Sequence, residues 1–227
     1  VSGDYKRQTD PTCAPFEPLP CDVFITEATF ALPVFTHPRA EDEVRKLLAS
    51  TAMFPERAHI VGAYALGKAQ RVMAMLRGRG WDKLIYVQGA LLALTELYQA
   101  HGVEFGDVRA VLEEPRSAYA GAIVLAPPGA LHTPWVRRFP DPVTCFCSGW
   151  MRIRARARQR GVELPLVISD HADWPDLKRT ILDVAAGEIW IMHGQGEALA
   201  HWCKTQNLLA KALHLVGYGQ EEEPEVA

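Results

Sequence analysis

The sequence predicts an α/β fold in which short parallel strands alternate with helices that cover both faces of a sheet. Three observations predict it. Short, almost wholly apolar runs recur along the chain, and stretches with a helical spacing of apolar residues lie between them. The composition, with 48% hydrophobic and 22% charged residues, is that of a globular protein. At 227 residues the chain can form one large domain or two modest ones.

The expected strands are the apolar runs themselves. Strands of this kind, without alternating polar residues, are typical of sheets that are buried on both faces. They are "VFIT" (23–26), "AHIVGA" (58–63), "LIYV" (84–87), "AIVLA" (122–126), "VTCFC" (143–147), "PLVIS" (165–169) and "EIWIMHG" (188–194).

Helices are expected between these strands. The segment 40–50 has acidic residues early and basic residues later, which matches the helix macrodipole. From Ala65 to Leu76 apolar residues recur at helical spacing, and two glycines then close the segment. Further helices are expected at 90–100 and 175–186, and the acidic tail "EEEPEV" (221–226) is expected to be solvated.

Charge and cysteine content limit the partners and the compartment. The formal net charge is −3, so a polyanion would have to be held by a local basic patch. Five cysteines without a CxxC pair fit a reducing compartment, and a cytoplasmic location is expected. No apolar run approaches membrane-spanning length, so no membrane partner is expected. Because the chain starts at Val1, without Met, and Val1 reads like the last residue of a strand, we expect upstream sequence to be missing.

Four polar residues near expected strand ends are candidates for a functional site: Asp4, Glu27, His171 and His193. Ligands of open α/β sheets bind beyond the carboxyl ends of the strands. Asp and His are suitable ligands for Zn²⁺ or Mn²⁺, and a Glu beside a His can orient it as a general acid. Singly, each residue is better explained as a turn, a cap or a surface histidine. Together, at the ends of strands in one sheet, they favour a site.

Five arginines occupy every second position of "MRIRARARQRG" (151–161). On an extended strand they would share one face, whereas on a helix they would scatter. Such a row could bind a phosphate backbone, or it could be a solvated edge strand protected by charge. Both interpretations stay open for Arg152, Arg154, Arg156, Arg158 and Arg160.

Several segments in combination resemble the β-CASP branch of the metallo-β-lactamase fold, and in particular the bacterial DNA-ligase-associated exonucleases, also described as messenger-RNA 3′-end-processing-like factors. The resemblance extends in order from residue 1 to about residue 203. The segments are "SGDYK", "DVFITEATF", "VGAYALGKAQRV", "SGWM", "ISDHADW" and "IMHGQGEALAHW".

The resemblance implies a role for each candidate residue. Asp4 matches an aspartate that bridges two divalent metal ions, Zn²⁺ or Mn²⁺, and His193 matches a metal-ligand histidine. Glu27 matches an acidic residue that partners a histidine, and His171 matches that histidine, which protonates the leaving oxygen. The arginine segment becomes a candidate for holding nucleic acid.

The resemblance also implies a domain organisation. Residues 1–39 and 165–227 would be parts of a metallo-β-lactamase αββα sandwich, and residues 40–164 an inserted, Rossmann-like β-CASP domain. The HxHxDH signature of the family, which supplies most metal ligands, is absent from these 227 residues. We therefore expect the signature upstream and the activity only in the full-length protein.

The implied activity is that of a metal-dependent nuclease that hydrolyses phosphodiester bonds at DNA or RNA ends, in DNA repair or RNA processing. An ATP-dependent DNA ligase and a helicase are partners that the resemblance implies. Two alternatives stay open: a small-molecule metallo-hydrolase of the same fold, and a catalytically silent subunit that binds nucleic acid. The "YALGKAQ" segment argues against the first, and retention of the four candidate residues argues against the second.

Overall fold

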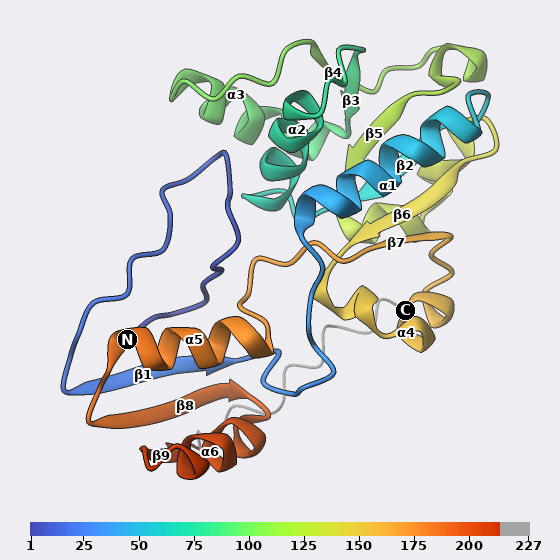
Figure 1. The fold of residues 1–227 in the computed structure, drawn as a ribbon. Coiled ribbons are helices and arrows are strands. Elements are labelled where there is room, and N and C mark those ends of the chain that lie inside the picture. Colours follow the sequence, from blue (N-terminus) through green and yellow to red (C-terminus); the bar gives the residue numbers. More distant parts are fainter. Residues whose placement is uncertain (214–227) are drawn as a thin grey trace. The chain divides into compact units, whose positions relative to one another are not determined.

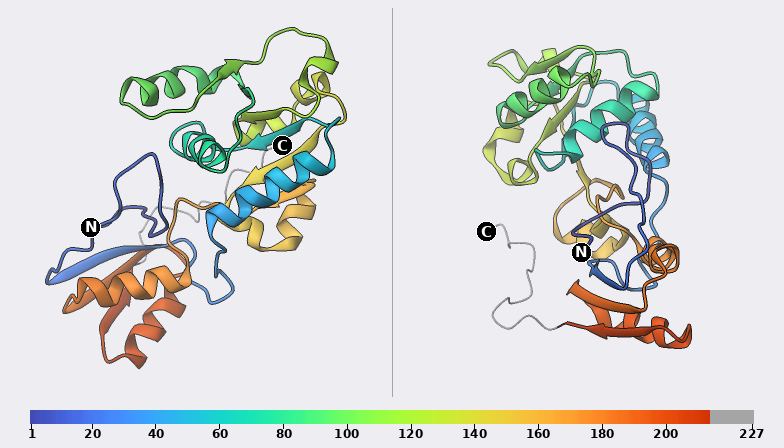
Figure 2. Two further views of the ribbon diagram at one scale, coloured as in Figure 1. Left: turned by 45° about the horizontal axis from the view of Figure 1, so that its top comes forward. Right: turned by 90° about the vertical axis from the view of Figure 1, so that its left-hand side faces the viewer.

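The chain folds into two compact units. A computed structural model describes residues 1–213, and the expected acidic tail and His214 lie outside this range. Unit 1 comprises Val1–Thr9, Pro15–His37 and the chain from Ser169 onward, and unit 2 comprises Asp10–Ala14 and Pro38–Ile168. Strand pairs in both units are parallel, which confirms the predicted α/β class (Figures 1 and 2). The expected domain identities stay a prediction.

Unit 2 contains a six-stranded parallel sheet in the order β4-β3-β5-β2-β6-β7. Its strands are β2 (His59–Gly62), β3 (Ile85–Val87), β4 (Val108–Ala110), β5 (Ile123–Ala126), β6 (Val143–Cys147) and β7 (Leu164–Leu166). Its α-helices are α1 (Ala40–Met53), α2 (Lys68–Gly78), α3 (Leu92–Ala100) and α4 (Arg154–Gln159). Short 3₁₀ helices are η1 (Gly89–Leu91), η2 (Arg116–Tyr119), η3 (Pro128–His132), η4 (Pro134–Arg138) and η5 (Gly149–Arg152).

Alternate residues of the unit 2 strands pack on opposite faces, because side chains along a strand alternate in direction. On β6, Cys145 and Cys147 belong to one apolar cluster, to which α1 and α2 also contribute. Phe146 belongs to a second cluster, which includes residues of η2, η3, η4, η5 and α4. Burial on both faces explains why the central strands β5 and β6 are almost wholly apolar in the sequence.

Unit 1 contains a three-stranded parallel sheet in the order β1-β8-β9. Its strands are β1 (Val23–Ala28), β8 (Glu188–Gly194) and β9 (Leu209–Ala212), and its helices are α5 (Trp174–Val184) and α6 (Gly196–Thr205). In Figure 1 helix α5 runs along the sheet formed by β1 and β8. Leu177 and Ile181 of α5 pack with Phe24 of β1 and Ile189 of β8 in one apolar cluster.

The expectation that the polar strand ends share one sheet is wrong. Glu27 and His193 lie on β1 and β8 of the three-stranded sheet, whereas "VTCFC" and "PLVIS" belong to the six-stranded sheet. The strand in "PLVIS" ends at Leu166, and the chain passes from unit 2 to unit 1 between Ile168 and Ser169. His171 therefore belongs to a loop of unit 1 rather than to a strand tip.

The arginine segment is helical, so neither an extended row nor an edge strand is present there. Arg152 ends η5, Arg154, Arg156 and Arg158 lie in α4, and Arg160 follows the helix. Arg and Ala are among the strongest helix formers. Ala157 anchors the helix, since its side chain is buried in the second cluster of unit 2.

Among the described residues, none of the helices combines the length and the apolar character that crossing a membrane requires.

Candidate functional site

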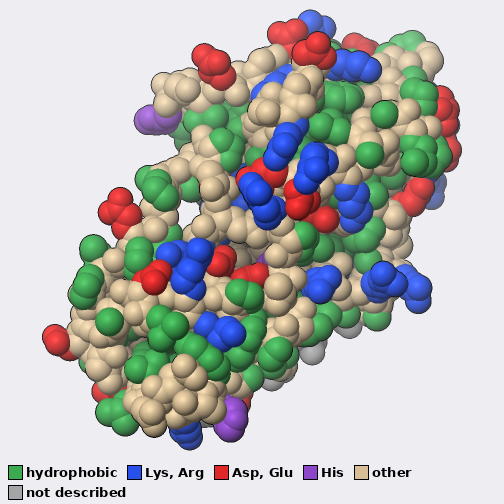
Figure 3. All heavy atoms as spheres, in the orientation of Figure 1, with side chains coloured by type: hydrophobic (Ala, Val, Ile, Leu, Met, Phe, Trp, Pro, Cys, Tyr) green, Lys and Arg blue, Asp and Glu red, His purple; other side chains and the backbone are tan. Residues whose placement is uncertain are grey.

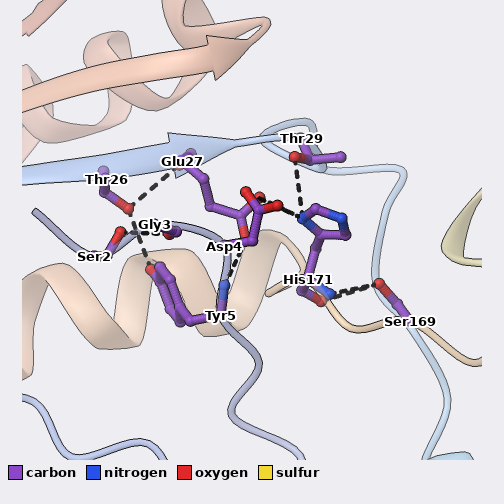
Figure 4. A network of polar contacts seen from close by, with 9 residues as sticks. All are labelled: Ser2, Gly3, Asp4, Tyr5, Thr26, Glu27, Thr29, Ser169 and His171. Carbon is purple, nitrogen blue, oxygen red and sulfur yellow. Dashed lines mark hydrogen bonds and ion pairs between the residues drawn. The ribbon is translucent and has the colours of Figure 1, made fainter. Parts of the chain in front are cut away.

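Glu27 is a buried carboxylate near the carboxyl end of β1, with 3% of its surface exposed. Its neighbours along the strand, Thr26 and Ala28, are also buried. A charge in such a place requires hydrogen-bond partners. The backbone N–H of Tyr5 donates to Oε1 over 3.2 Å, and His171 Nδ1 lies 2.9 Å from Oε2 (Figure 4). Both carboxylate oxygens are thus engaged.

The "SGDY" segment lies alongside the end of β1 and brings Asp4 to Glu27. The backbone N–H of Ser2 donates to the carbonyl of Ile25 over 2.9 Å. Gly3 has φ of +60°, a conformation that glycine adopts readily. Tyr5 is buried, and its hydroxyl lies 3.3 Å from the hydroxyl of Thr26. Asp4, between these anchors, has a side chain that is 60% exposed.

His171 is positioned by the loop that precedes α5. Its backbone N–H donates to the Ser169 hydroxyl over 3.0 Å, and that hydroxyl donates back to the His171 carbonyl over 3.1 Å. Asp173 accepts from the backbone N–H of Asp176 over 3.0 Å and caps α5. Asp173 also accepts from the backbone N–H of His37 over 2.7 Å. The aspartate therefore holds the loop.

Three of the four candidate side chains converge within unit 1. Ligand atoms of Asp4, Glu27 and His171 all lie within 4.8 Å of one another. Asp4 Oδ1 is 3.8 Å from His171 Nδ1, and the Thr29 hydroxyl is 3.3 Å from the same nitrogen (Figure 4). Glu27 comes from β1, His171 from a loop 144 residues later, and Asp4 from the segment that begins the described chain.

The pKa of Glu27 is held below its ordinary value. Burial alone would raise it, but the hydrogen bond and charge of His171 outweigh burial, with further help from Thr29 and the Tyr5 N–H. An ionised carboxylate only accepts hydrogen bonds, so the contact with Glu27 places a hydrogen on His171 Nδ1. The pair thereby fixes the orientation of the ring and directs proton exchange to Nε2.

His193 lies on the strand next to Glu27 but outside this group of three. The register between β1 and β8 shifts between the pairs Thr26–Ile191 and Ala28–Gly194, so Met192 and His193 oppose Glu27 alone. This β-bulge gives His193 a φ of +58° and leaves its side chain exposed. A Cβ on Gly194 would lie 2.3 Å from the Ala28 carbonyl oxygen, so glycine is required there. Such bulges re-aim side chains next to active sites.

The donor types suit a divalent ion, although two of the three are already paired. Carboxylate and imidazole groups bind Zn²⁺ and Mn²⁺. Glu27 and His171 Nδ1 hold each other, and Asp4 is the exposed carboxylate of the group. The set therefore fits a metal ion that takes Asp4 as a ligand and leaves the Glu27–His171 pair intact.

Tyr5 and Thr29 also hold the site, and the sequence reasoning did not single them out. Tyr5 contributes its backbone N–H to Glu27, and its ring stacks on Phe16 with centroids 4.5 Å apart. Thr29 lies two residues beyond Glu27, in "TEAT". The side chains of Arg152, Arg154, Arg156, Arg158 and Arg160 belong to unit 2.

Comparisons with known proteins find a similar sequence that carries a functional name. No protein-family model matches the chain. The chain is 23% identical over 214 residues to a protein of Opitutus terrae named "Probable DNA ligase". The match covers 93% of this chain and 21% of the relative, so the chain spans about a fifth of that protein's length.

A solved structure is similar in fold. A protein of unknown function from Enterococcus faecalis V583 matches with a TM-score of 0.54 at 12% identity. The match covers 87% of this chain and 51% of that chain. At this identity the likeness shows the fold alone.

Proposed function

We propose that this chain is part of a metal-dependent phosphodiester hydrolase that acts on nucleic acid, with unit 1 as part of a metallo-β-lactamase domain and unit 2 as an inserted β-CASP domain. The observation that carries the proposal is the buried Glu27 bound to His171, with the exposed Asp4 beside them. A buried acid–histidine pair next to an exposed carboxylate is costly for a structural turn, and it suits proton transfer.

His171 is the general acid of the proposed reaction. Glu27 holds Nδ1–H and keeps the ring in one orientation, and Nε2 then delivers a proton to the sugar oxygen that leaves phosphorus. Burial alone would raise the pKa of Glu27, but the hydrogen bond and charge of His171, with smaller contributions from Thr29 and the Tyr5 N–H, lower it and favour the ionised form. Glu27 is a positioning residue, since it acts through His171.

Asp4 and His193 would hold divalent metal ions, Zn²⁺ or Mn²⁺. When bound, such ions supply an activated water and neutralise charge on the phosphate. Asp4 is suited to the role by its exposed carboxylate, and His193 by its place in the bulge opposite Glu27. Further ligands would come from the HxHxDH signature that we expect upstream, so the proposal concerns the full-length protein.

The name of the Opitutus terrae relative supports DNA as a substrate and a DNA ligase as a functional partner. A helicase partner and a role in RNA processing remain proposals from the resemblance. The surface of unit 2 supports a polyanionic substrate, because exposed arginines follow Met151 in the chain.

The test is a cleavage assay with the full-length protein, using end-labelled single-stranded DNA and RNA and either Zn²⁺ or Mn²⁺. We expect metal-dependent release of nucleotides or short fragments, and we expect His171→Ala to slow it while metal content stays normal. Hydrolysis of a thioester or a lactone, with no phosphodiester cleavage, would support the small-molecule alternative. Binding of nucleic acid without any cleavage would support the silent-subunit alternative.

A further inference from the structure

A strongly basic surface lies on unit 2, outside the candidate site. Residues 128–161 contain seven arginines and a single acidic residue, Asp141. Arg57 lies 3.0 Å from the carboxylate of Asp141, so this one negative charge is neutralised from another segment. The arginines are carried by η4, by η5, by α4 and by the residue that follows α4: Arg137, Arg138, Arg152, Arg154, Arg156, Arg158 and Arg160.

Six of these seven arginines are exposed, and Arg160 is half-buried. Within residues 1–213, no ion pair joins Arg137, Arg152, Arg154 or Arg158 to a carboxylate. In the space-filling view, Lys and Arg side chains gather at the position of α4 (Figure 3). Like charges at this density repel one another, and a bound polyanion relieves the repulsion.

Two tryptophans are interleaved with the arginines. The guanidinium of Arg156 lies over the Trp150 ring, 3.9 Å from its centroid, and that of Arg138 lies 5.6 Å from the centroid of Trp135. Both rings are half-buried and pack against the same apolar cluster of unit 2. The tryptophans therefore belong to one face of the six-stranded sheet, and each presents part of a rigid aromatic surface.

We propose that this surface, defined as η4, η5 and α4 with Trp135 and Trp150, binds single-stranded nucleic acid. Arginine forks bind phosphate oxygens, and aromatic rings with stacked guanidinium groups provide platforms for unpaired bases. A duplex keeps its bases inside the stack and can use only the arginines. The inference rests on the proposed function only in taking a polynucleotide as ligand.

The test is a binding measurement with the full-length protein in EDTA, so that metal-dependent cleavage does not interfere. Fluorescence anisotropy of a labelled oligothymidylate is followed at several salt concentrations. We expect the single strand to bind more tightly than a duplex of equal length. Binding weakens as salt rises, and each arginine–phosphate contact makes the slope of log K against log salt steeper by about 0.7 for a single strand. The double variant Arg154→Gln/Arg158→Gln should therefore reduce the magnitude of this negative slope by about 1.4.

Control variants separate the contribution of the arginine charges to binding from base stacking and from loss of the fold. Arg79→Gln/Arg109→Gln removes two exposed arginines elsewhere on unit 2, one of them on β4 at the opposite edge of the sheet, and should leave the slope unchanged. Trp135→Leu should weaken single-strand binding about 5-fold or more with the slope retained, because stacking contributes about 1–3 kcal/mol per base, which is about 5- to 150-fold. The melting temperature of each variant checks the fold.

An unchanged slope in the Arg154/Arg158 variant would overturn the proposed binding surface. Equal reductions of the slope in the Arg154/Arg158 and Arg79/Arg109 variants would also overturn it. Binding to phosphatidylcholine–phosphatidylglycerol vesicles, with no binding to the oligonucleotide, would also overturn it. Because no metal is present, the result is independent of catalysis. If the wild type cleaves nucleic acid but the Arg154/Arg158 variant shows no change in slope, the binding surface is rejected and the hydrolase proposal stands. If binding follows the prediction but nothing is cleaved, the hydrolase proposal is rejected and the binding surface stands.

Discussion

The substitution Glu27→Gln tests the acid–histidine pair without changing its shape. The two Glu27 oxygens accept from the Tyr5 N–H and from His171 Nδ1–H, at 3.2 and 2.9 Å. A Gln side chain has one oxygen and one NH₂ group, so it cannot accept both bonds. If the oxygen stays with Tyr5, the NH₂ group faces Nδ1. Nδ1 of His171 can accept a hydrogen bond from this NH₂ group only if the ring carries its hydrogen on Nε2 instead of Nδ1.

The magnitude follows from the bond that is lost. A hydrogen bond to a charged group contributes about 1.5–3 kcal/mol. If this energy stabilises the protonated, correctly oriented His171 in the transition state, its loss slows cleavage by about 10- to 150-fold, at about 1.4 kcal/mol for each factor of ten. The fold should survive, because the alternative tautomer satisfies the new amide.

The assay combines single-turnover cleavage of a labelled oligonucleotide with ¹⁵N NMR of His171, which distinguishes the two tautomers. The matched control is Glu43→Gln. Glu43 is also buried and accepts a backbone N–H, that of Val167 over 2.7 Å, but it belongs to unit 2 and not to the site. Cleavage in Glu27→Gln within threefold of the wild-type rate, or a His171 tautomer that does not change, would exclude Glu27 as the residue that positions His171.

Three further predictions use other observations. The pKa of Glu27 is lower in the folded state than its ordinary value of 4.5. The ionised carboxylate therefore contributes to the free energy of unfolding above pH 4.5, and this contribution is lost as the pH falls through the folded pKa. Acid titration of the free energy of unfolding should show this loss in the wild type and not in Glu27→Gln. Asp4→Asn should lower metal content and cleavage together while the melting temperature of the metal-free protein in EDTA stays unchanged. Normal metal content measured by mass spectrometry would remove Asp4 from the ligand set. A chromogenic disulfide reagent at pH 8 should label the exposed Cys13 and Cys21 first. Burial raises the pKa of Cys203 to about 11, so its thiol should react slowly. Rapid labelling of Cys203 in the folded protein would contradict its buried position.

The apolar strands could be predicted from the sequence because the sheet of unit 2 is buried on both faces. "AIVLA" and "VTCFC" are continuously apolar for this reason, and β5 and β6 lie inside them. Strands β4 and β9 were not predicted. Both are three or four residues long, lie at sheet edges and are only partly buried, so their sequences "VRA" and "LAKA" carry no apolar run.

The arginine segment shows how a period of two can mislead. Alternation of Arg and Ala fits an extended strand by pattern, but both residues favour helices, and one buried alanine is enough to anchor α4. The burial of Ala157 depends on a surface built by distant segments. No local pattern contains that information.

The sequence singles out Asp4, Glu27 and His171, which lie together in the folded chain, but it does not predict their arrangement. Glu27 and His171 are 144 positions apart, and only the folded chain brings them to 2.9 Å. The shared-sheet argument that joined them was wrong, since His171 lies in a loop after the chain leaves unit 2. The bulge at His193 depends on the register of β1 against β8, which a single strand does not encode.

A substrate in which sulfur replaces the leaving oxygen tests whether His171 protonates that oxygen during cleavage. Thiolates leave readily without a proton, so a bridging phosphorothiolate substrate does not need a general acid. For His171→Ala in the full-length protein, we predict cleavage of the normal oligonucleotide about 10²- to 10⁴-fold slower than wild type, and cleavage of the sulfur-bridged oligonucleotide close to wild type. Equal slowing of cleavage for both substrates would contradict the role of His171 as general acid.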